Sequence, residues 1–241
     1  MKLNSKDVET LRAILAAAKV VDVDGIVLTN GMASGARLSL DAAILTKSNL
    51  SMSEALRLGI GRVAELDKRL SVFGGSCEIE GKVNEAGDVS MLTLISGKTK
   101  MQFRCTSVAL MKYPKANDDE VQAVIKMTRA EVQQVSRAVK TLAAERLTLQ
   151  VKRDGNARLE CVDSSNDRFD IELSNPVEFP GEIESSVNAY IASRLVDVLD
   201  AAAKDSEEIT LSLGEAGSLT ATAKGHTLIV FTQINGEEDD E

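Results

Sequence analysis

Two segments of the chain share one pattern of apolar positions and lie 124 residues apart, so that position 8 corresponds to position 132. In both segments apolar residues recur at i, i+3 and i+7, which is typical of an amphipathic helix with one buried stripe. Each segment begins with a residue suited to an N-cap, Asn4 or Ser5 in the first and Thr128 in the second,. Thr128 also has Glu131 three residues later, which predicts a capping box.

The elements that follow these helices are predicted in the same order in both halves. This order matters because any two amphipathic helices can be aligned, whereas a repeated series of elements indicates duplication. We therefore predict an α+β fold in which one domain occurs twice. In the first half we expect a helix at 5–20, strands at 25–30, 37–40 and 43–47, a helix at 60–73, and strands at 77–83, 90–96 and 99–108; in the second half we expect a helix at 129–140, strands at 147–153, 157–162 and 168–173, a helix at 186–204, and strands at 208–213, 219–224 and 227–234,.

The stretch between the two halves differs from both in composition. It contains Pro114 and Asn117 and then three consecutive acidic residues, 118–120, which indicates an extended connector on the surface,. The last five residues are all acidic and indicate a frayed tail,. The resulting division is domain 1 at 1–110, connector at 111–124, domain 2 at 125–235 and tail at 236–241.

Composition and charge restrict the function further. An apolar fraction of 44% is enough to fill packed cores, which excludes a wholly disordered chain,. The net charge of −9 argues against a protein that coats nucleic acid with its whole surface, although a local basic face is compatible with it,. With no Trp, two Tyr and five Phe, stacking on bases is not expected to be the basis of function,.

The motifs of common enzymes are missing from the sequence. There is no phosphate-binding glycine loop, no zinc-protease motif and no nucleophile elbow,. The single histidine, His226, lies in a predicted surface turn, so we expect no enzyme activity, no cofactor and no metal site. Three widely separated cysteines, Cys77, Cys105 and Cys161, favour a reducing, cytoplasmic setting,. No apolar run approaches the roughly 18–20 residues of a membrane span.

As a whole, the chain resembles the sliding clamps of DNA replication, most closely those of tailed phages and more distantly the proliferating-cell-nuclear-antigen type. The resemblance rests on the repeated order of elements and on three stretches, namely the opening 1–7 (MKLNSKD), the helix at 62–73 (RVAELDKRLSVF) and 127–142 (MTRAEVQQVSRAVKTL). It implies domains of two helices backed by antiparallel sheets, and a ring of three chains around duplex DNA. It also implies a tethered DNA polymerase, an ATP-driven clamp loader and, for a phage protein, a location in the host cytoplasm.

In such a ring the helices line the hole, so their polar faces are expected to be basic. Opposite the apolar stripe of the helix at 129–140 stand only basic or neutral residues, whereas a merely solvated helix face is usually mixed in sign,. The helix at 186–204 departs from this pattern, because it carries Asp197 and Asp200 on its outer face. The side chains expected to face DNA are Lys126, Arg129, Gln133, Arg137, Lys140, Arg12, Lys19, Arg62, Lys68 and Arg69.

The resemblance also implies two protein interfaces. Ring closure is expected between the strand near 100–108 of one subunit and that near 168–173 of the next, with Phe103, Arg104, Phe169 and Asp170 at the joint. A pocket for the apolar peptides of polymerases and loaders is expected beneath the connector, although the same residues could simply hold the connector to the second domain. Its expected lining is Val108, Leu110, Tyr113, Pro114, Val230, Phe231 and Ile234.

A second interpretation from another class stays open. A non-enzymatic structural or assembly protein with duplicated α+β domains would have the same internal repeat. The two differ in the mass of the particle in solution, because a clamp has three times the 25.8 kDa of the chain whereas an assembly protein would be a monomer or a large polymer.

Overall fold

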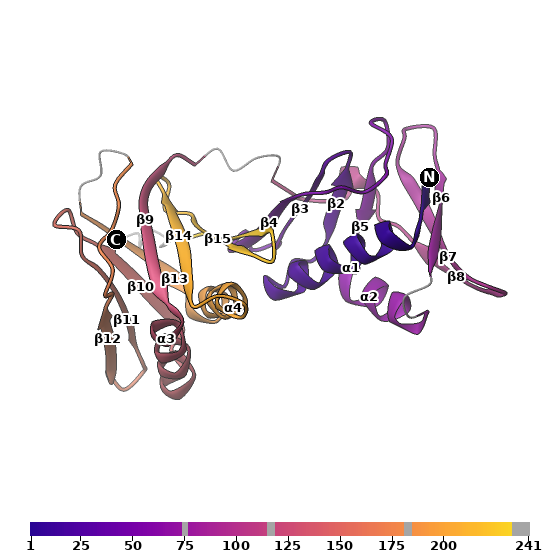
Figure 1. Cartoon of the computed structure of the whole chain (residues 1–241). Coiled ribbons are helices and arrows are strands. Elements are labelled where there is room, and N and C mark those ends of the chain that lie inside the picture. Colours follow the sequence, from indigo (N-terminus) through magenta and orange to yellow (C-terminus); the bar gives the residue numbers. More distant parts are fainter. Residues whose placement is uncertain (74–76, 115–118, 181–184, 233–241) are drawn as a thin grey trace, which may run out of the picture. The chain divides into compact units, whose positions relative to one another are not determined.

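The computed structural model describes residues 1–73, 77–114, 119–180 and 185–232. The chain forms two compact units, each of which is described by itself. Unit 1 comprises Met1–Asn117 and Gly225–Leu228, and unit 2 comprises Asp118–Lys224 and Ile229–Glu241. Figure 1 labels the elements of both units.

The described residues of unit 1 form two helices and two antiparallel sheets. One sheet has the order β1-β6-β7-β8, and the strands of the other run β5-β2-β3-β4. A short 3₁₀ turn, Val108–Leu110, follows the last strand of the first sheet. In chain order the elements are β1 (Lys2–Leu3), α1 (Ser5–Val20), β2 (Ile26–Thr29), β3 (Met32–Ala36), β4 (Ala42–Lys47), β5 (Leu58–Ile60), α2 (Val63–Val72), β6 (Glu78–Val83), β7 (Val89–Ser96) and β8 (Thr99–Arg104).

Unit 2 repeats this order element by element. One sheet has the order β12-β11-β10-β13, and β9, β14 and β15 are successive neighbours in the other. The elements are β9 (Val121–Thr128), α3 (Arg129–Leu142), β10 (Arg146–Val151), β11 (Ala157–Val162), β12 (Arg168–Glu172), β13 (Ser186–Ile191), α4 (Ala192–Ala203), β14 (Glu208–Gly214), β15 (Leu219–Ala223) and β16 (His226–Val230), the last of which is divided between the units. The structure confirms the predicted α+β fold and its duplication.

The first helix of each unit begins as the sequence predicts. The side chain of Asn4 accepts hydrogen bonds from the amides of Lys6 and Asp7, and that of Thr128 accepts one from the amide of Glu131. Both caps are complete capping boxes,. The apolar stripes of α1 and α3 are buried, and each helix packs beside the second helix of its own unit, α1 with α2 and α3 with α4 (Figure 1).

Three predicted elements are wrong in part. The segment 186–204 is not one helix, because 186–191 forms β13 and pairs with β10, burying Tyr190. The helix expected at 60–73 begins only at Val63, after the short strand β5. Residues 37–40 form a turn rather than a strand, with Leu40 at φ 56° and its N–H bonded to the carbonyl of Arg37. In each case the competing structure depends on residues distant in sequence or on a turn that alternation does not reveal.

The expected place of His226 also needs adjustment. His226 is the half-buried first residue of β16 rather than part of the turn, which lies at Lys224 and Gly225. Burial lowers the pKa of its imidazole. The acidic tail lies outside the described residues. Among those that are described, no helix combines the length and apolar character needed to cross a membrane.

Candidate nucleic-acid and subunit interfaces

The outer face of α3 carries the basic stripe that the sequence predicts. Gln133, Arg137 and Lys140 are exposed, Arg129 is half-buried at the first position of the helix, and the apolar stripe on the other side is buried. Arg137 makes no ion pair with any described residue, so its charge is available to a ligand. The structure therefore brings four of the predicted DNA-facing side chains onto one helix.

Two acidic residues moderate this stripe. Asp200 of α4 accepts a hydrogen bond from Ser136 Oγ at 2.6 Å and lies 3.5 Å from Lys140 Nζ. Glu207 lies 3.3 Å from Arg129 Nη1. Asp200 is one of the two acids of α4 that depart from a basic lining. It contacts Ser136 and Lys140 of α3 and so joins the two helices of unit 2.

Lys126 lies apart from the stripe. It belongs to strand β9, before the helix begins, and its Nζ is 2.7 Å from Glu178 Oε1. The hydrogen bond and charge of Glu178 raise the pKa of Lys126. On sequence alone Lys126 groups with the basic residues of the helix, whereas the structure places it in the strand that leads into the cap at Thr128.

The basic residues of unit 1 are divided between two environments. On α1, Arg12 is half-buried, and Lys19 is exposed with its Nζ 2.8 Å from Asp67 Oδ2 of α2. Lys68 of α2 is exposed. The side chains of Arg62 and Arg69 instead extend to β8.

Arg62, the N-cap residue of α2, and Arg69 both lie over Phe103 and donate hydrogen bonds to the backbone of β8. Their guanidinium carbons are 4.9 Å and 5.2 Å from the ring centroid, for Arg62 and Arg69 respectively. Arg69 Nη1 donates to the carbonyl of Gln102 at 2.8 Å, and Arg62 Nη2 donates to that of Arg104 at 3.3 Å. This arrangement combines cation–π contact with charge-assisted hydrogen bonds. The sequence predicted a basic face for α2 but not that the side chains of Arg62 and Arg69 point to β8.

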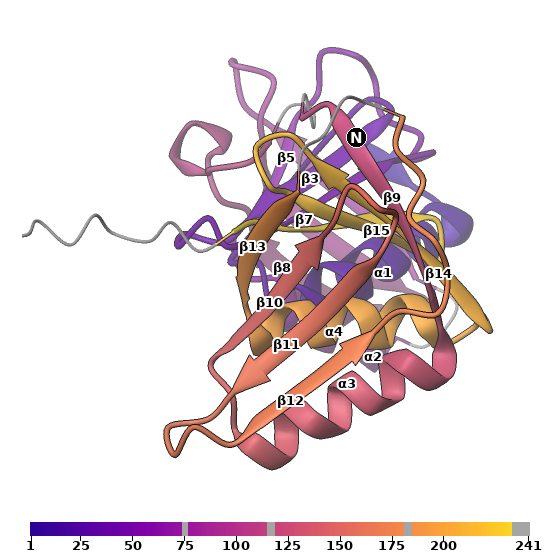
Figure 2. The same ribbon diagram turned by 90° about the vertical axis from the view of Figure 1, so that its left-hand side faces the viewer.

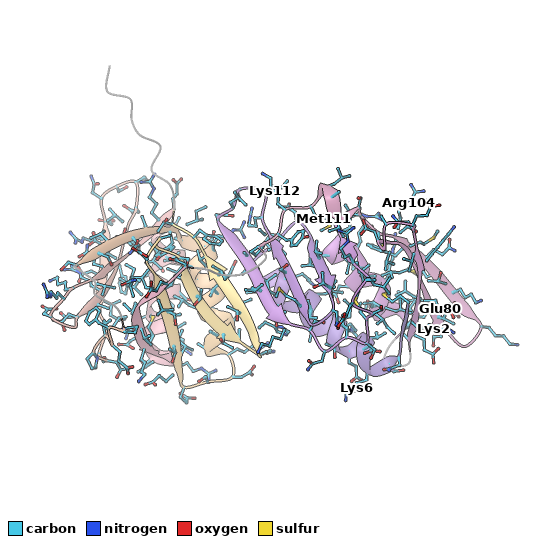
Figure 3. All side chains as sticks on the ribbon, turned by 90° about the horizontal axis from the view of Figure 1, so that it is seen from above. Lys2, Lys6, Glu80, Arg104, Met111 and Lys112 are labelled. Carbon is cyan, nitrogen blue, oxygen red and sulfur yellow. The ribbon has the colours of Figure 1, made fainter. Side chains whose placement is uncertain are left out.

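The predicted joint residues lie on two end strands. β8 is the last strand of its sheet in unit 1, and β12 is the last of its sheet in unit 2 (Figures 1 and 2). Phe103 is buried within unit 1, and Arg104 is exposed and projects outward (Figure 3). Phe169 is half-buried, and Asp170 is exposed with Arg158 Nη2 at 2.8 Å.

The predicted pocket residues fall into two sets. In unit 1, Val108 is buried, Leu110 is 82% exposed, and Tyr113 and Pro114 are half-buried. In unit 2, Val230 is buried and Phe231 is half-buried, whereas Ile234 lies outside the described residues.

Met111 is an apolar residue of the connector that does not belong to the predicted pocket lining. Added Cβ atoms at Gly25 and Gly59 would lie 2.6 Å from Met111 Cε and 2.8 Å from its Sδ, respectively (Figure 3 labels Met111). The start of the connector is thus seated where two glycines leave room. Gly25, the first residue of a predicted strand, was the available signal, whereas Gly59 lies just before the helix that the sequence predicts at 60–73,.

In the part of the chain that the structure describes, each unit has two helices packed together and two antiparallel sheets, and the order of elements repeats from one unit to the next. This arrangement is the clamp fold of the proliferating cell nuclear antigen (PCNA) type, with two domains per chain. Solved structures with this fold include PCNA from Entamoeba histolytica, at 13% identity and TM-score 0.64, covering 96% of this chain and 97% of that one.

Two archaeal structures are similar to the same extent. A. fulgidus PCNA, solved with the C-terminal region of FEN-1 bound, has 16% identity and TM-score 0.67 over 98% of this chain and 99% of that one. The PCNA2–PCNA3 complex of Sulfolobus tokodaii has 14% identity and TM-score 0.61, covering 97% of this chain and 98% of that one. No family model matches the sequence, and no curated protein matches it.

Proposed function

We propose that this protein is a sliding clamp that encircles duplex DNA as a homotrimeric ring and tethers the replicative DNA polymerase. The observation that carries the proposal is the basic face of α3, displayed on a duplicated clamp fold. A clamp holds DNA by topology, so its lining needs positive charge but no base-specific contacts. Arg137 and Lys140 meet that need, with the neutral Gln133 beside them, on a chain whose net charge is −9.

The proposed lining does not require every helix to be strongly basic. Tight phosphate binding would impede sliding, and Asp200 and Glu207 partly neutralise two of the cations on α3. Arg12, Lys19 and Lys68 supply further positive charge from unit 1, and their helices correspond to α3 and α4 in the repeat. Lys126, which is bound to Glu178, belongs to the margin of this face.

The partners follow from the same function. A ring must be opened to enclose DNA, so the proposal includes an ATP-driven loader besides the polymerase. We place the peptide site of both at Val108, Leu110, Tyr113 and Pro114 with Val230, Phe231 and Ile234. The A. fulgidus protein, which has the same fold, was solved with the C-terminal region of FEN-1 bound, and this supports a site for a partner segment on the present chain. The phage type, and with it a host cytoplasmic location, rests on the sequence resemblance at 1–7 and 62–73.

Charge reversal on α3 tests the DNA-facing proposal. Arg129, Arg137 and Lys140 are changed together to Glu, and the trimer is titrated with a labelled duplex of mixed sequence at several salt concentrations. Because each lost phosphate contact removes about 0.9 from the slope of log K against log salt, the slope is expected to fall by about 2–3 and the affinity to fall with it. Light scattering is expected to show an unchanged trimer.

A matched control carries the same change of charge away from α3. Lys152 and Arg153 lie in the β10–β11 turn and Lys224 in the β15–β16 turn, and all three are exposed. Their simultaneous change to Glu should leave the salt slope close to that of the wild type. If both triple variants lose affinity equally, the effect is one of net charge and α3 is not the DNA-facing surface.

Particle mass separates the clamp from the alternative of a duplicated assembly protein. Size-exclusion chromatography with light scattering is expected to yield three times the 25.8 kDa of the chain. A monomer or a large polymer would contradict the ring.

A further inference from the structure

The turn between β14 and β15 leaves two backbone N–H groups for an acceptor outside it. Its own backbone closes the turn, because the N–H of Gly214 donates to the carbonyl of Ser218 at 2.8 Å and the N–H of Gly217 donates to that of Gly214 at 3.0 Å. Gly217 has φ 84°, in the left-handed region that glycine adopts without strain,. The N–H groups of Ala216 and Ser218 take no part in this closure.

The carboxylate of Asp119 accepts hydrogen bonds from both of these groups. Its Oδ1 accepts from the N–H of Ala216 at 2.7 Å, and its Oδ2 accepts from the N–H of Ser218 at 3.1 Å. The hydroxyl of Ser218 also donates to Oδ2. Backbone N–H groups that converge in a turn form an anion-binding nest, and hydrogen bonds to a charged acceptor are about twice as strong as those between neutral groups.

Close packing shows that the turn is built around this carboxylate. A Cβ atom added at Gly214 would overlap Oδ2 of Asp119, so glycine leaves the space that the oxygen occupies,. Ser218 is only 3% exposed, so its polar groups depend on Asp119 rather than on water,. From β13, the hydroxyl of Tyr190 donates to the carbonyl of Gly217 at 2.8 Å and fixes the turn. Burial, and after it the charge of Asp119, raises the pKa of Tyr190, so this hydroxyl remains a donor.

Asp119 is the first described residue of unit 2 and belongs to the connector. The carbonyl of Glu120, the next residue, accepts from the N–H of Glu215 at 2.9 Å, and β9 then begins at Val121 beside β14 (Figure 1). The other end of the connector is held differently, since Met111 is seated against glycines of unit 1. Packing therefore holds one end, and charge-assisted hydrogen bonds hold the other.

Neighbouring acids show that charge alone does not bring a carboxylate to this turn. Glu120 and Glu215 are exposed, and their side chains make no hydrogen bond to a described residue. No described basic side chain pairs with Asp119, so its carboxylate is held by N–H and O–H donors. The geometry of these donors selects Asp119 from the three acids.

We propose that the β14–β15 turn is a carboxylate-binding nest and that Asp119, as its bound carboxylate, latches the connector to unit 2. Two N–H groups and one hydroxyl match the two oxygens of a carboxylate, whereas an amide has one acceptor oxygen and would turn its own N–H donors towards the nest. The latch does not depend on ring formation, because all of its contacts lie within unit 2. In the clamp, and resting on that proposed function, Asp119 becomes a positioning residue for the connector.

Removal of the carboxylate and its chemical replacement test the nest in the full chain. Asp119→Ala keeps the Cβ atom and loses only the carboxylate, so added formate can enter the vacated space. Hydrogen exchange is measured in the turn, at Ala216 and Ser218, and in the connector at Val121, which lies opposite Gly214. We expect exchange at these three amides to become at least about tenfold faster in Asp119→Ala. Formate should slow it again, with a protection that saturates as the nest fills.

Two matched variants and one salt are the controls. Asp119→Asn keeps the size of the side chain but places an amide in the nest, so exchange should be fast and formate should not slow it. Glu120→Gln removes the same charge one residue away and should exchange like the wild type. Sodium chloride at the same concentration as sodium formate separates anion binding from ionic strength.

The position of the faster exchange distinguishes a latch from a general loss of stability. A latch predicts that Leu211 and Leu213, in the middle of β14, exchange as in the wild type, whereas a merely structural contact would speed exchange throughout unit 2,. Where Asp119→Ala does not fold, Ser218→Ala takes its place. It removes only the hydroxyl donor and should speed exchange at Val121 about threefold,.

Three outcomes would overturn the latch. Unchanged exchange at Val121 in Asp119→Ala, or in Ser218→Ala where that variant replaces it, would mean that the carboxylate does not hold the connector. Formate that protects no better than chloride would mean that the turn is not a carboxylate nest. Equal acceleration in Leu211 and in the turn would make the contact merely structural. The experiment needs neither DNA nor a partner, so its failure is distinct from that of the proposed clamp, which the mass of the particle decides.

Discussion

The carboxylate of Glu131 joins the start of α3 to the segment after β12, so its removal should loosen the helix on which the DNA-facing stripe lies. Its Oε2 accepts from the N–H of Thr128 at 2.7 Å and from Thr128 Oγ1 at 2.8 Å, and its Oε1 accepts from the N–H of Ser174 at 2.8 Å. The residue is only 6% exposed. The change considered is Glu131→Gln, which keeps the size of the side chain.

The expected loss follows from the donors. An amide has one acceptor oxygen, so its NH₂ group must face either Thr128 or Ser174, leaving at least one donor unsatisfied at a cost of about 1–3 kcal/mol. Loss of a negative charge in the first helical turn adds about 0.3–1 kcal/mol. We therefore expect Glu131→Gln to lower the free energy of unfolding by roughly 2–3 kcal/mol at pH 7, measured by urea titration, with hydrogen exchange locating the loss in α3.

The pH dependence identifies the carboxylate as the cause. Burial alone would raise the pKa of Glu131, but the hydrogen bonds from Ser174 and Thr128 outweigh it and lower the pKa below the ordinary value of 4.5. A lowered pKa in the folded state means that the stabilisation is complete above pH 4.5 and is lost as the pH falls through that value and then through the lower folded pKa,. The difference between wild type and Glu131→Gln should therefore shrink in acid.

An exposed glutamate just after α3 provides the control. Glu145→Gln removes the same charge, and the side chain of Glu145 makes no hydrogen bond to a described residue. It should change stability by less than about 0.5 kcal/mol. If Glu131→Gln is as mild as Glu145→Gln, or if its effect is the same at pH 7 and in acid, the buried carboxylate does not anchor α3.

Three further changes test other contacts. Tyr190→Phe removes the buried hydrogen bond from the hydroxyl to the carbonyl of Gly217 at 2.8 Å and should cost about 1 kcal/mol by urea titration, whereas an unchanged midpoint would mean that the bond contributes nothing,. Gly59→Ala would drive a Cβ into the carbonyl oxygen of Thr106 and should cost about 1–3 kcal/mol, and a thermal midpoint equal to that of the wild type would contradict the close approach,. Asp200→Asn removes the acid beside the stripe of α3, so the trimer should bind a mixed-sequence duplex about two- to fivefold more tightly, and weaker binding would argue against α3 as the DNA-facing helix,.

The amino-acid sequence by itself determined the elements that depend on nearby residues. The apolar spacing and the N-caps Asn4 and Thr128 place α1 and α3, because a helix is defined by contacts within one or two turns and by its own first amides,. The duplication was also visible, since it is a property of order along the chain. The basic character of α3 followed from counting positions on one face.

Only the tertiary structure decided what depends on residues far apart. Residues 186–191 are apolar enough for a helix, yet pairing with β10 makes them a strand,. Arg62 and Arg69 have the spacing of a solvent-facing stripe, but β8, more than thirty residues away, supplies the carbonyls that direct them to a sheet edge. Asp200 appeared, together with Asp197, as an acid on the outer face of a helix, and only the structure places Ser136 of α3 beside it. Local periodicity defines a helix and its faces, but the group that each face meets is defined only when distant segments pack together.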